Sequence, residues 1–334
     1  MNNLNSIDTT MPVEAADSPI WPQLSKRGKV NISTAADTSP LHIYYEIFGT
    51  GSERVVFING MGADRQMWEP NVGEFLKRKG QYQCLVYDHR GTGYSDHNVS
   101  PRTFTTTAMA SDLKKLLVAL GWSKVNIIGA SMGGMVALEF ASASPEMVKT
   151  LTLVVTNAGL SLPPMRGIID TLSANFTSDP LKRFEEICGS IYTREYLDSP
   201  APDGSGCKTM LEFCAKNAIR RSKYCRPMSF AGFMGQVGTV FRHYVSPARL
   251  ANIGRMIPGK RILIITGDED HMVRTSNSVH LADRIGRDNV ILEIFRGAGH
   301  GVNSQESTRF IDSVVALIDR VNSEEAIAEH APEN

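Results

Sequence analysis

The chain has 334 residues, of which 42% are apolar and 21% are charged, and its 35 basic residues balance its 35 acidic residues. This length and composition are typical of a soluble globular protein with a substantial core, and they exclude wholesale disorder and a fibrous class. The even charge balance creates no overall field that would attract the chain to nucleic acid or to an anionic membrane surface, so we expect a small-molecule partner.

The first 38 residues are polar with little hydrophobic periodicity, which predicts a flexible lead-in, although residues 30–33 could join an edge strand. Acidic side chains at Asp8, Glu14 and Asp17 and the lack of an apolar stretch argue against a targeting peptide, so we expect a cytoplasmic protein. The apolar runs are strand-length, too short to span a bilayer. The five cysteines lack metal-like spacing, so we expect reduced thiols and no zinc site.

From residue 41 onwards, segments of strand character alternate with segments of helical periodicity. The predicted strands are 41–48, 54–59, 82–87, 125–128, 151–155, 261–266 and 290–295, and the predicted helices are 67–78, 109–120, 132–143, 277–285 and 305–321. Such alternation predicts an α/β fold with a doubly wound, mostly parallel sheet and helices on both faces.

About a hundred residues between the strands ending at 155 and starting at 261 do not continue the alternation, and we expect them to form a mostly helical cap over the strand ends. The predicted organisation is a lead-in at 1–38, a core at 39–156 and 260–322, an inserted cap at 157–259 and a polar tail at 323–334. The cap carries a basic cluster, which we interpret as a solvated face, with a site for an anionic substrate or a partner as the alternative: Arg220, Arg221, Lys223 and Arg226.

The segment 129–133 has the pattern G-x-S-x-G around Ser131, and it lies directly between a buried-type strand and a predicted helix. A serine on a strained strand-to-helix turn needs small neighbours, because larger side chains would collide with nearby backbone. The following helix directs its positive end at the site, so the N–H of Met132 is a candidate oxyanion donor. Ser131 is therefore the candidate nucleophile.

A serine hydroxyl needs a base, and His300 follows the last predicted strand with a glycine on either side. A carboxylate must orient that histidine, and the turn after the preceding strand provides Asp268, Glu269 and Asp270. We favour Asp270 over Asp268, because its longer excursion from the strand end can reach a neighbouring loop. The sequence leaves that choice open.

The second oxyanion donor is expected in the loop that follows the strand 54–59. Gly60 allows the backbone to approach the serine, and the N–H of Met61 is the best candidate. Gly60, Met61 and Met132 are also the candidate substrate-binding residues, since they adjoin the reacting centre. The alternative interpretation of this loop is an ordinary glycine turn.

With these motifs, the sequence resembles the α/β-hydrolase superfamily, in its serine-nucleophile, lid-bearing branch, across residues 41–321. The resemblance rests on the serine turn, the turns at Asp270 and His300, and the chain order Ser, Asp, His. It implies that the D-x-R-G-x-G-x-S segment at 88–95 is mainly architectural. Many members carry His-Gly after the oxyanion strand, whereas this chain has Asn59-Gly60.

The resemblance implies a cofactor-independent serine hydrolase that cleaves a carboxylic ester, lactone or thioester of a small apolar substrate, with neither metal nor organic cofactor. Carbon–carbon bond hydrolysis, acyl transfer, perhydrolysis and lipid-ester hydrolysis remain alternatives on the same residues. A ligand-binding protein without turnover is an alternative of another class. A lipase that docks its cap on lipid would show an exposed apolar face on a cap helix. The oligomeric state stays open.

Overall fold

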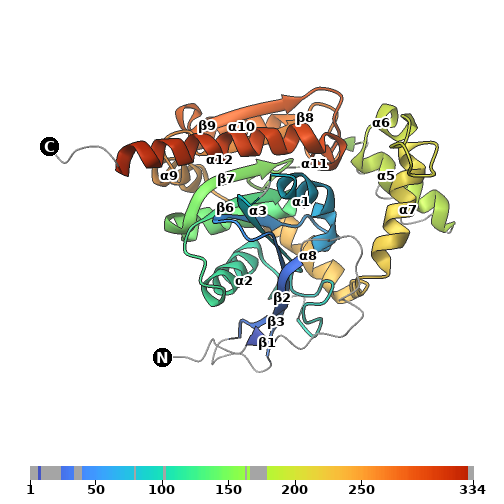
Figure 1. Ribbon diagram of the computed structural model, residues 1–334, viewed down its shortest axis with the longest axis horizontal. Helices are drawn as coiled ribbons and strands as arrows, with labels where there is room; N and C mark the ends of the chain where they lie inside the picture. Colours follow the sequence, from blue (N-terminus) through green and yellow to red (C-terminus); the bar gives the residue numbers. More distant parts are fainter. Residues whose placement is uncertain are drawn as a thin grey trace.

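The computed structural model describes residues 7–8, 24–33, 40–78, 80–100, 103–161, 164–165 and 179–329. Within these residues, nine strands form one sheet in the order β1-β2-β3-β5-β4-β6-β7-β8-β9 (Figure 1). The strands are β1 (Ile7–Asp8), β2 (Leu24–Asn31), β3 (His42–Phe48), β4 (Glu53–Ile58), β5 (Tyr82–Tyr87), β6 (Val125–Ala130), β7 (Val148–Val154), β8 (Ile262–Gly267) and β9 (Val290–Phe295). The first three pairs of neighbours are antiparallel and the other five are parallel. The predicted α/β fold is confirmed.

Side chains alternate along each strand, so the inner strands direct apolar side chains to both faces of the sheet, and helices cover both faces. On β4, Val55 and Phe57 belong to one buried cluster, whereas Val56 and Ile58 belong to the other. The first cluster includes residues of α1 (Glu69–Leu76) and α12 (Ser307–Glu329). The second includes residues of α2 (Thr106–Ala119), α3 (Met132–Ala143), α9 (Pro247–Met256) and α10 (Thr275–Ile285). Each such buried side chain contributes roughly 1.5–3 kcal/mol, so the layers hold the sheet between them.

Three elements differ from the prediction in ways that change the organisation of the chain. The expected helix 67–78 is divided into the 3-10 helix η2 (Arg65–Trp68) and α1, and it starts early because the Asp64 carboxylate caps the Gln66 N–H at 2.7 Å. Strand β2 begins at Leu24, so part of the expected lead-in belongs to the sheet. Helix α12 runs to Glu329, through most of the expected polar tail. Within the expected lead-in and tail, residues 1–6, 9–23, 34–38 and 330–334 lie outside the described residues.

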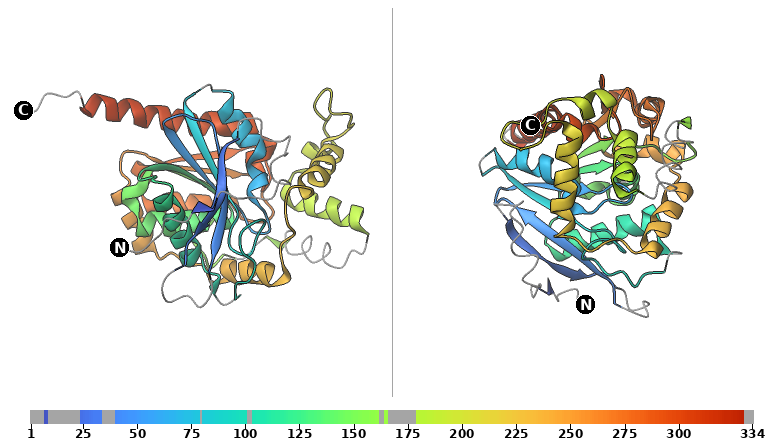
Figure 2. Two further views of the ribbon diagram at one scale, coloured as in Figure 1. Left: turned by 60° about the horizontal axis from the view of Figure 1, so that its bottom comes forward. Right: turned by 90° about the vertical axis from the view of Figure 1, so that its right-hand side faces the viewer.

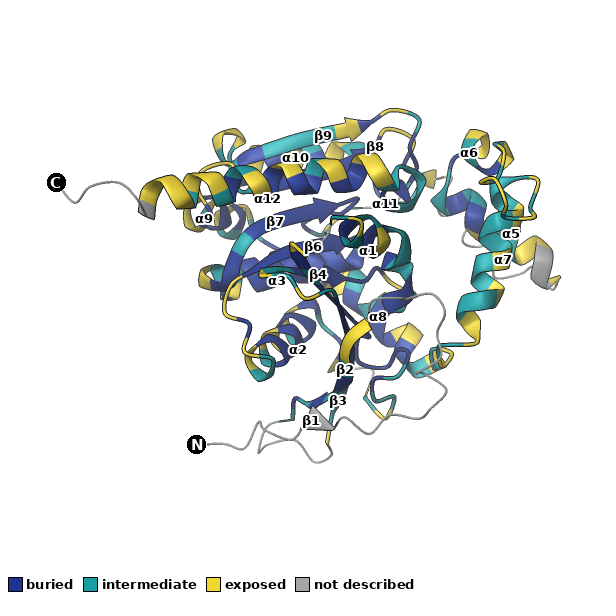
Figure 3. Cartoon of the chain, in the orientation of Figure 1, coloured by how far each residue is buried: buried dark blue, intermediate teal, exposed yellow. Residues whose placement is uncertain are grey.

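Between β7 and β8 the chain leaves the sheet and forms an insert. Its helices are α5 (Pro180–Ile191), α6 (Arg194–Asp198), α7 (Met210–Ser222), α8 (Phe230–Arg242) and α9. Helix α9 packs against α3 and α10 and so extends the core. Helices α5, α6 and α7 pack on one another to one side of the sheet (Figures 1 and 2), and no residue of α7 is buried (Figure 3).

An ion-pair cluster attaches the insert to the start of α1. Arg220 and Arg221 each place a guanidinium nitrogen 2.8 Å from the Glu69 carboxylate. Gln66 also donates to the carbonyl oxygen of Arg221 at 3.1 Å. Two members of the basic cluster therefore anchor the insert, which corrects their interpretation as a solvated face. No helix in the described ranges has both the length and the apolar character needed to cross a membrane.

Candidate active site

Ser131 lies between the last residue of β6 and the first residue of α3, with φ 54° and ψ −120°. This left-handed backbone is costly for a residue with a side chain, so the surroundings must enforce it. A Cβ atom on Gly129 would lie 2.4 Å from the Gly133 carbonyl oxygen, and one on Gly133 would lie 2.1 Å from that of Ile58. The G-x-S-x-G pattern thus reflects two backbone contacts that only glycine permits.

The peptide groups of Ser131 are held from several sides. Its N–H donates to the Val154 carbonyl at 2.9 Å, and its own carbonyl accepts the Thr156 hydroxyl at 2.7 Å and the Gly134 N–H at 2.9 Å. The side chain has no such partner: no hydrogen bond from Ser131 Oγ occurs within the part of the chain that the structure describes. The turn therefore fixes the backbone while it leaves the hydroxyl available.

His300 and Asp270 meet on the same sheet edge. Strands β6, β8 and β9 are parallel members of one ladder, so the residues that follow them emerge at one edge. His300 Nδ1 lies 2.9 Å from Asp270 Oδ2, and the imidazole is 13% exposed. An ionised carboxylate only accepts hydrogen bonds, so Nδ1 carries the hydrogen and the neutral ring has its lone pair on Nε2.

The two candidate acids, Asp270 and Asp268, have different partners. Asp270 Oδ1 accepts the N–H groups of Met272 and Val273, both at 2.8 Å, while its Oδ2 faces His300. Asp268 Oδ1 accepts the N–H of Gly297 at 2.7 Å, at the start of the turn that leads to His300. Asp270 is thus the carboxylate in contact with the imidazole, and Asp268 braces the turn.

The glycines beside His300 accommodate the insert. A Cβ atom on Gly299 would lie 2.7 Å from the carbonyl oxygen of Ile191, and one on Gly301 would lie 2.4 Å from the Tyr192 ring. The Gly301 N–H donates to the same Ile191 carbonyl at 2.8 Å. The end of α5 therefore packs directly on the His300 turn.

The loop after β4 lies against the serine turn. A Cβ atom on Gly60 would be 3.6 Å from Cβ of Ser131, so the two backbones approach closely. Met61 is 37% exposed and Met132 is buried. Within the described ranges, neither the Met61 N–H nor the Met132 N–H donates to another residue of the chain. Both N–H groups are free to bind an oxygen atom.

Two buried side chains support this loop, and the sequence analysis assigned a role to neither. The Gln236 amide on α8 accepts the Gly62 N–H at 2.9 Å and donates to the Thr92 hydroxyl at 3.0 Å. His89 donates from Nε2 to the Asn59 carbonyl at 3.1 Å, and burial lowers the pKa of His89 to about 4, so the ring is neutral at pH 7. Their loop partners are 174 and 30 residues away in the chain, and no local pattern indicates such pairs.

We expect Gln236→Leu to lower kcat about tenfold, because the Gly62 N–H loses its acceptor and the loop beside Ser131 loses order. Ester hydrolysis measured over a range of substrate concentrations separates kcat from KM. Thr239→Ala is the matched control, since Thr239 is buried on the same helix and donates only to the Gly235 carbonyl. Equal losses in both variants would contradict a specific role for Gln236.

The D-x-R-G-x-G-x-S segment holds a buried ion-pair network. Asp88 accepts the Arg65 and Tyr94 N–H groups, both at 2.9 Å, and pairs with the Arg65 guanidinium at 3.1 Å. Burial raises the pKa of Asp88 to about 6 against the opposing effect of Arg65. Arg90 binds both carboxylate oxygens of Asp112 at 2.6 and 2.7 Å. These contacts tie loops together.

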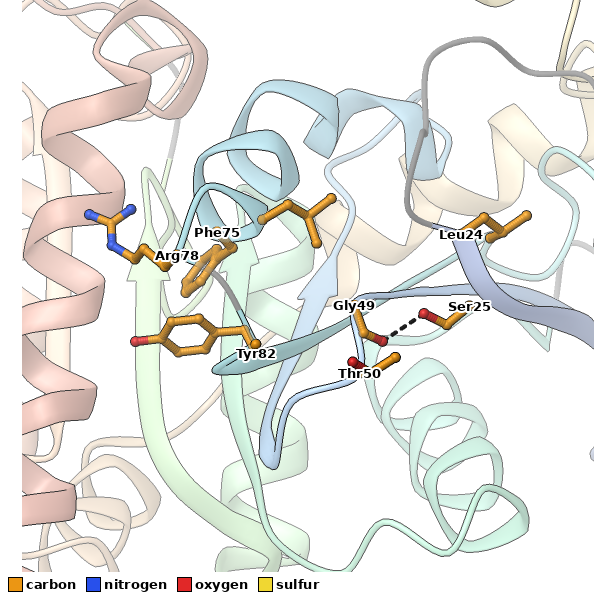
Figure 4. A pocket seen from close by; sticks show the side chains of 9 residues that line it. Leu24, Ser25, Gly49, Thr50, Phe75, Arg78 and Tyr82 are labelled. Carbon is orange, nitrogen blue, oxygen red and sulfur yellow. Dashed lines mark hydrogen bonds between the residues drawn. The ribbon is translucent and has the colours of Figure 1, made fainter.

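A cavity of about 440 Å³ opens at the other end of the sheet (Figure 4). Phe75 and Tyr82 line it, together with Gly49, whose carbonyl accepts the Ser25 hydroxyl at 2.7 Å. Tyr82 begins β5, whereas Ser131 follows the end of β6, and both strands run parallel to β4. The cavity therefore lies away from Ser131, and its lining includes neither histidine nor a carboxylate.

A family model described as alpha/beta hydrolase fold matches residues 53–307 of the chain. A protein of Azorhizobium caulinodans that carries the name of a carbamate hydrolase is 37% identical over 112 residues, which are 34% of this chain and 40% of that protein. The chain thus spans less than half the length of this curated relative.

Solved structures cover more of the chain. The meta-cleavage product hydrolase from Pseudomonas fluorescens superposes with a TM-score of 0.65 at 18% identity, covering 84% of this chain and 95% of the other. The enol-lactonase from Burkholderia xenovorans has a TM-score of 0.64 at 20% identity, covering 84% and 97%. At these identities the likeness concerns the fold.

Proposed function

The chain belongs to the α/β-hydrolase family, and from this premise we propose that it is a serine hydrolase acting through an acyl-enzyme on Ser131. The substrate we propose is a carboxylic ester, lactone or thioester of a small apolar molecule. The main support is the 2.9 Å contact of His300 Nδ1 with the buried Asp270 carboxylate, at the sheet edge where Ser131 occupies its left-handed turn.

In the proposed cycle, Ser131 Oγ attacks the carbonyl carbon while His300 Nε2 accepts the hydroxyl proton. The carbonyl π electrons move to the oxygen, and the N–H groups of Met61 and Met132 bind the resulting oxyanion. The tetrahedral intermediate collapses, and the leaving alcohol or thiol takes the proton from His300. Water then attacks the acyl-enzyme by the same route, which releases the acid and restores Ser131. None of these steps needs a metal or organic cofactor.

The N–H groups of Met61 and Met132 support the oxyanion role, because neither has an acceptor among the described residues and the Met132 residue is buried. Met61 is well suited to contact substrate, since its exposed side chain lies on the loop packed against Ser131. Gly60, which adjoins Ser131, completes the proposed substrate-binding set. We also propose that the insert acts as a cap, because α5 contacts the His300 turn and α8 contacts the Gly62 loop.

A fluorophosphonate probe tests the proposal without knowledge of the substrate, since it reacts only with an activated serine. We expect a covalent adduct on the peptide that contains Ser131, located by mass spectrometry, and no adduct in Ser131→Ala. His300→Ala should lower the labelling rate by orders of magnitude because the base is missing. A folded wild-type protein that stays unlabelled would overturn the proposal in favour of ligand binding without turnover.

A further inference from the structure

Helix α8 presents its apolar side to the solvent. Four large apolar residues share its outer face, here called the α8 surface, and their exposed fractions are 80% for Phe230, 40% for Phe233, 44% for Met234 and 75% for Phe241. The buried residues are small or polar: Gly232, Gly235, Gln236 and Thr239. At 100° per residue these two sets fall on opposite sides of the helix. The usual order of an amphipathic helix in a globular protein is therefore inverted.

Helix α8 cannot rotate about its axis to bury its outer face. A Cβ atom on Gly232 would lie 2.5 Å from the Gly91 carbonyl oxygen, and one on Gly235 would lie 2.6 Å from the Phe104 ring. Gln236 between them binds the Gly62 loop. A rotation of α8 that buried its phenylalanines would break each of these contacts. The exposure of the α8 surface is thus built into the packing of the helix.

The α8 surface lies at the periphery of the molecule. Helix α8 forms the lower edge in the left view of Figure 2 and the right-hand edge in the right view. Two more exposed apolar side chains adjoin its C-terminal end: Tyr244 forms a β-bridge with Gly159, and Leu160, which is 86% exposed, follows that glycine. An exposed apolar patch of this kind on a folded protein marks a surface that binds something.

Basic side chains lie at both ends of α8. Residues 213–267 include ten basic residues and no acidic one, and four of them, Arg220, Arg221, Arg249 and Arg261, are paired with carboxylates elsewhere in the fold. Lys223 and Arg226 lie in the turn before α8, and Arg242 is its last residue; all three are exposed. Among the described residues, Lys223 and Arg226 form no ion pair, unlike Arg220 and Arg221, which bind Glu69. Cations thus flank both ends of the apolar stripe.

We propose that the α8 surface docks the protein on an anionic phospholipid membrane. The phenylalanines and Met234 would enter the boundary between headgroups and acyl chains, while Lys223, Arg226 and Arg242 pair with lipid phosphates. A second copy of the chain is a poorer occupant, because a symmetric contact through this face would bring the two basic rims together. An anionic membrane offers acyl chains to the apolar side chains of the α8 surface and phosphates to the cations beside it.

Docking would place lipid on the opposite side of α8 from the loop of the candidate active site. The inner face of α8 holds the Gly62 loop through Gln236, and that loop packs against Ser131. Membrane binding by the outer face does not require turnover, however, so the proposal stands or falls separately from the assignment of Ser131. The experiment therefore uses the Ser131→Ala chain, which removes hydrolysis as a complication.

Co-sedimentation with vesicles tests the docking. We expect the full chain to bind vesicles of equal parts phosphatidylcholine and phosphatidylglycerol, and to bind pure phosphatidylcholine far more weakly. Phe230→Ser with Phe241→Ser should lower partitioning about tenfold, because two exposed apolar anchors are lost without any change in the core. Lys223→Gln with Arg226→Gln should lower it about fivefold for each charge, and added salt should act in the same direction.

Val118→Ser is the matched control, since Val118 is 52% exposed on α2, a helix outside the insert. It should bind as the parent chain does, and circular dichroism should show that all variants are folded. Equal sedimentation of parent and α8 variants, or an equal loss in Val118→Ser, would overturn the proposal. The proposal would also be overturned if the parent chain did not bind vesicles but formed a dimer in sedimentation velocity, and the α8 variants did not form that dimer. The occupant of the α8 surface would then be a second copy of the chain.

Discussion

Replacing Ser131 with alanine is expected to lower kcat for ester hydrolysis by about 10⁴-fold or more, because the proposed acyl-enzyme route loses its nucleophile. The residual rate would come from binding and from the free N–H groups of Met61 and Met132. The measurement is hydrolysis of p-nitrophenyl esters of increasing acyl length by purified wild-type and variant protein. The acyl length that the wild type prefers also reports the size of the pocket that binds the acyl group.

The Ser131→Ala variant should keep its fold, so a loss of rate reports chemistry. The hydroxyl forms no hydrogen bond within the described residues, and the backbone contacts to Val154, Thr156 and Gly134 involve only peptide groups of Ser131. Alanine and serine bear a similar penalty at φ 54°. Turnover close to that of the wild type, in a variant with an unchanged melting temperature, would show that another residue starts the reaction.

The core of the fold could be predicted because its determinants are local. The last four residues of strand β4, Val55 to Ile58, are an unbroken apolar run, which indicates burial on both faces, and the two clusters that receive its alternate side chains bear this out. The glycines at 129 and 133 indicate a tight turn, because a side chain at either position would collide with neighbouring backbone. Because β6, β8 and β9 are parallel, their carboxyl ends lie at one edge of the sheet, and this follows from the predicted fold alone.

The insert could not be predicted in this way. Helix α8 carries a clear apolar stripe, which normally predicts the buried side, yet its buried side consists of glycines, a threonine and Gln236. Which face packs inward was decided by Phe104 and Gly91, more than a hundred residues earlier in the chain. The role of Gln236 depends on the same long-range packing. Only the end of strand β2 falls in the segment 30–33 that was expected to join the sheet, because the first three residues of the strand are exposed and show no apolar alternation.

The choice between Asp268 and Asp270 marks the limit of sequence analysis within the site. Both acids follow β8 within three residues, and which one meets His300 depends on how a short turn directs two similar side chains. The structure separates them by their partners: two N–H groups and the imidazole for Asp270, and the Gly297 N–H for Asp268. This difference leads to a paired experiment with opposite expectations.

Asp270→Asn is expected to lower kcat about 10⁴-fold with little loss of stability. The asparagine oxygen can keep the N–H groups of Met272 and Val273, which directs its amide NH₂ at His300 Nδ1. A donor at that position forces the imidazole hydrogen onto Nε2, and a ring in that tautomer cannot take the proton of Ser131. Because the turn survives, the melting temperature should change far less than the rate.

Asp268→Asn is the matched control, because an asparagine oxygen can still accept the Gly297 N–H and the substitution does not alter the partner of His300. We expect its kcat to stay within about threefold of the wild type, since a retained neutral hydrogen bond differs little in energy from the original one. Measuring kcat and melting temperature for both variants decides the matter. Equal losses of rate would mean that the turn as a whole positions His300, and a larger loss in Asp268→Asn would transfer the orienting role to Asp268.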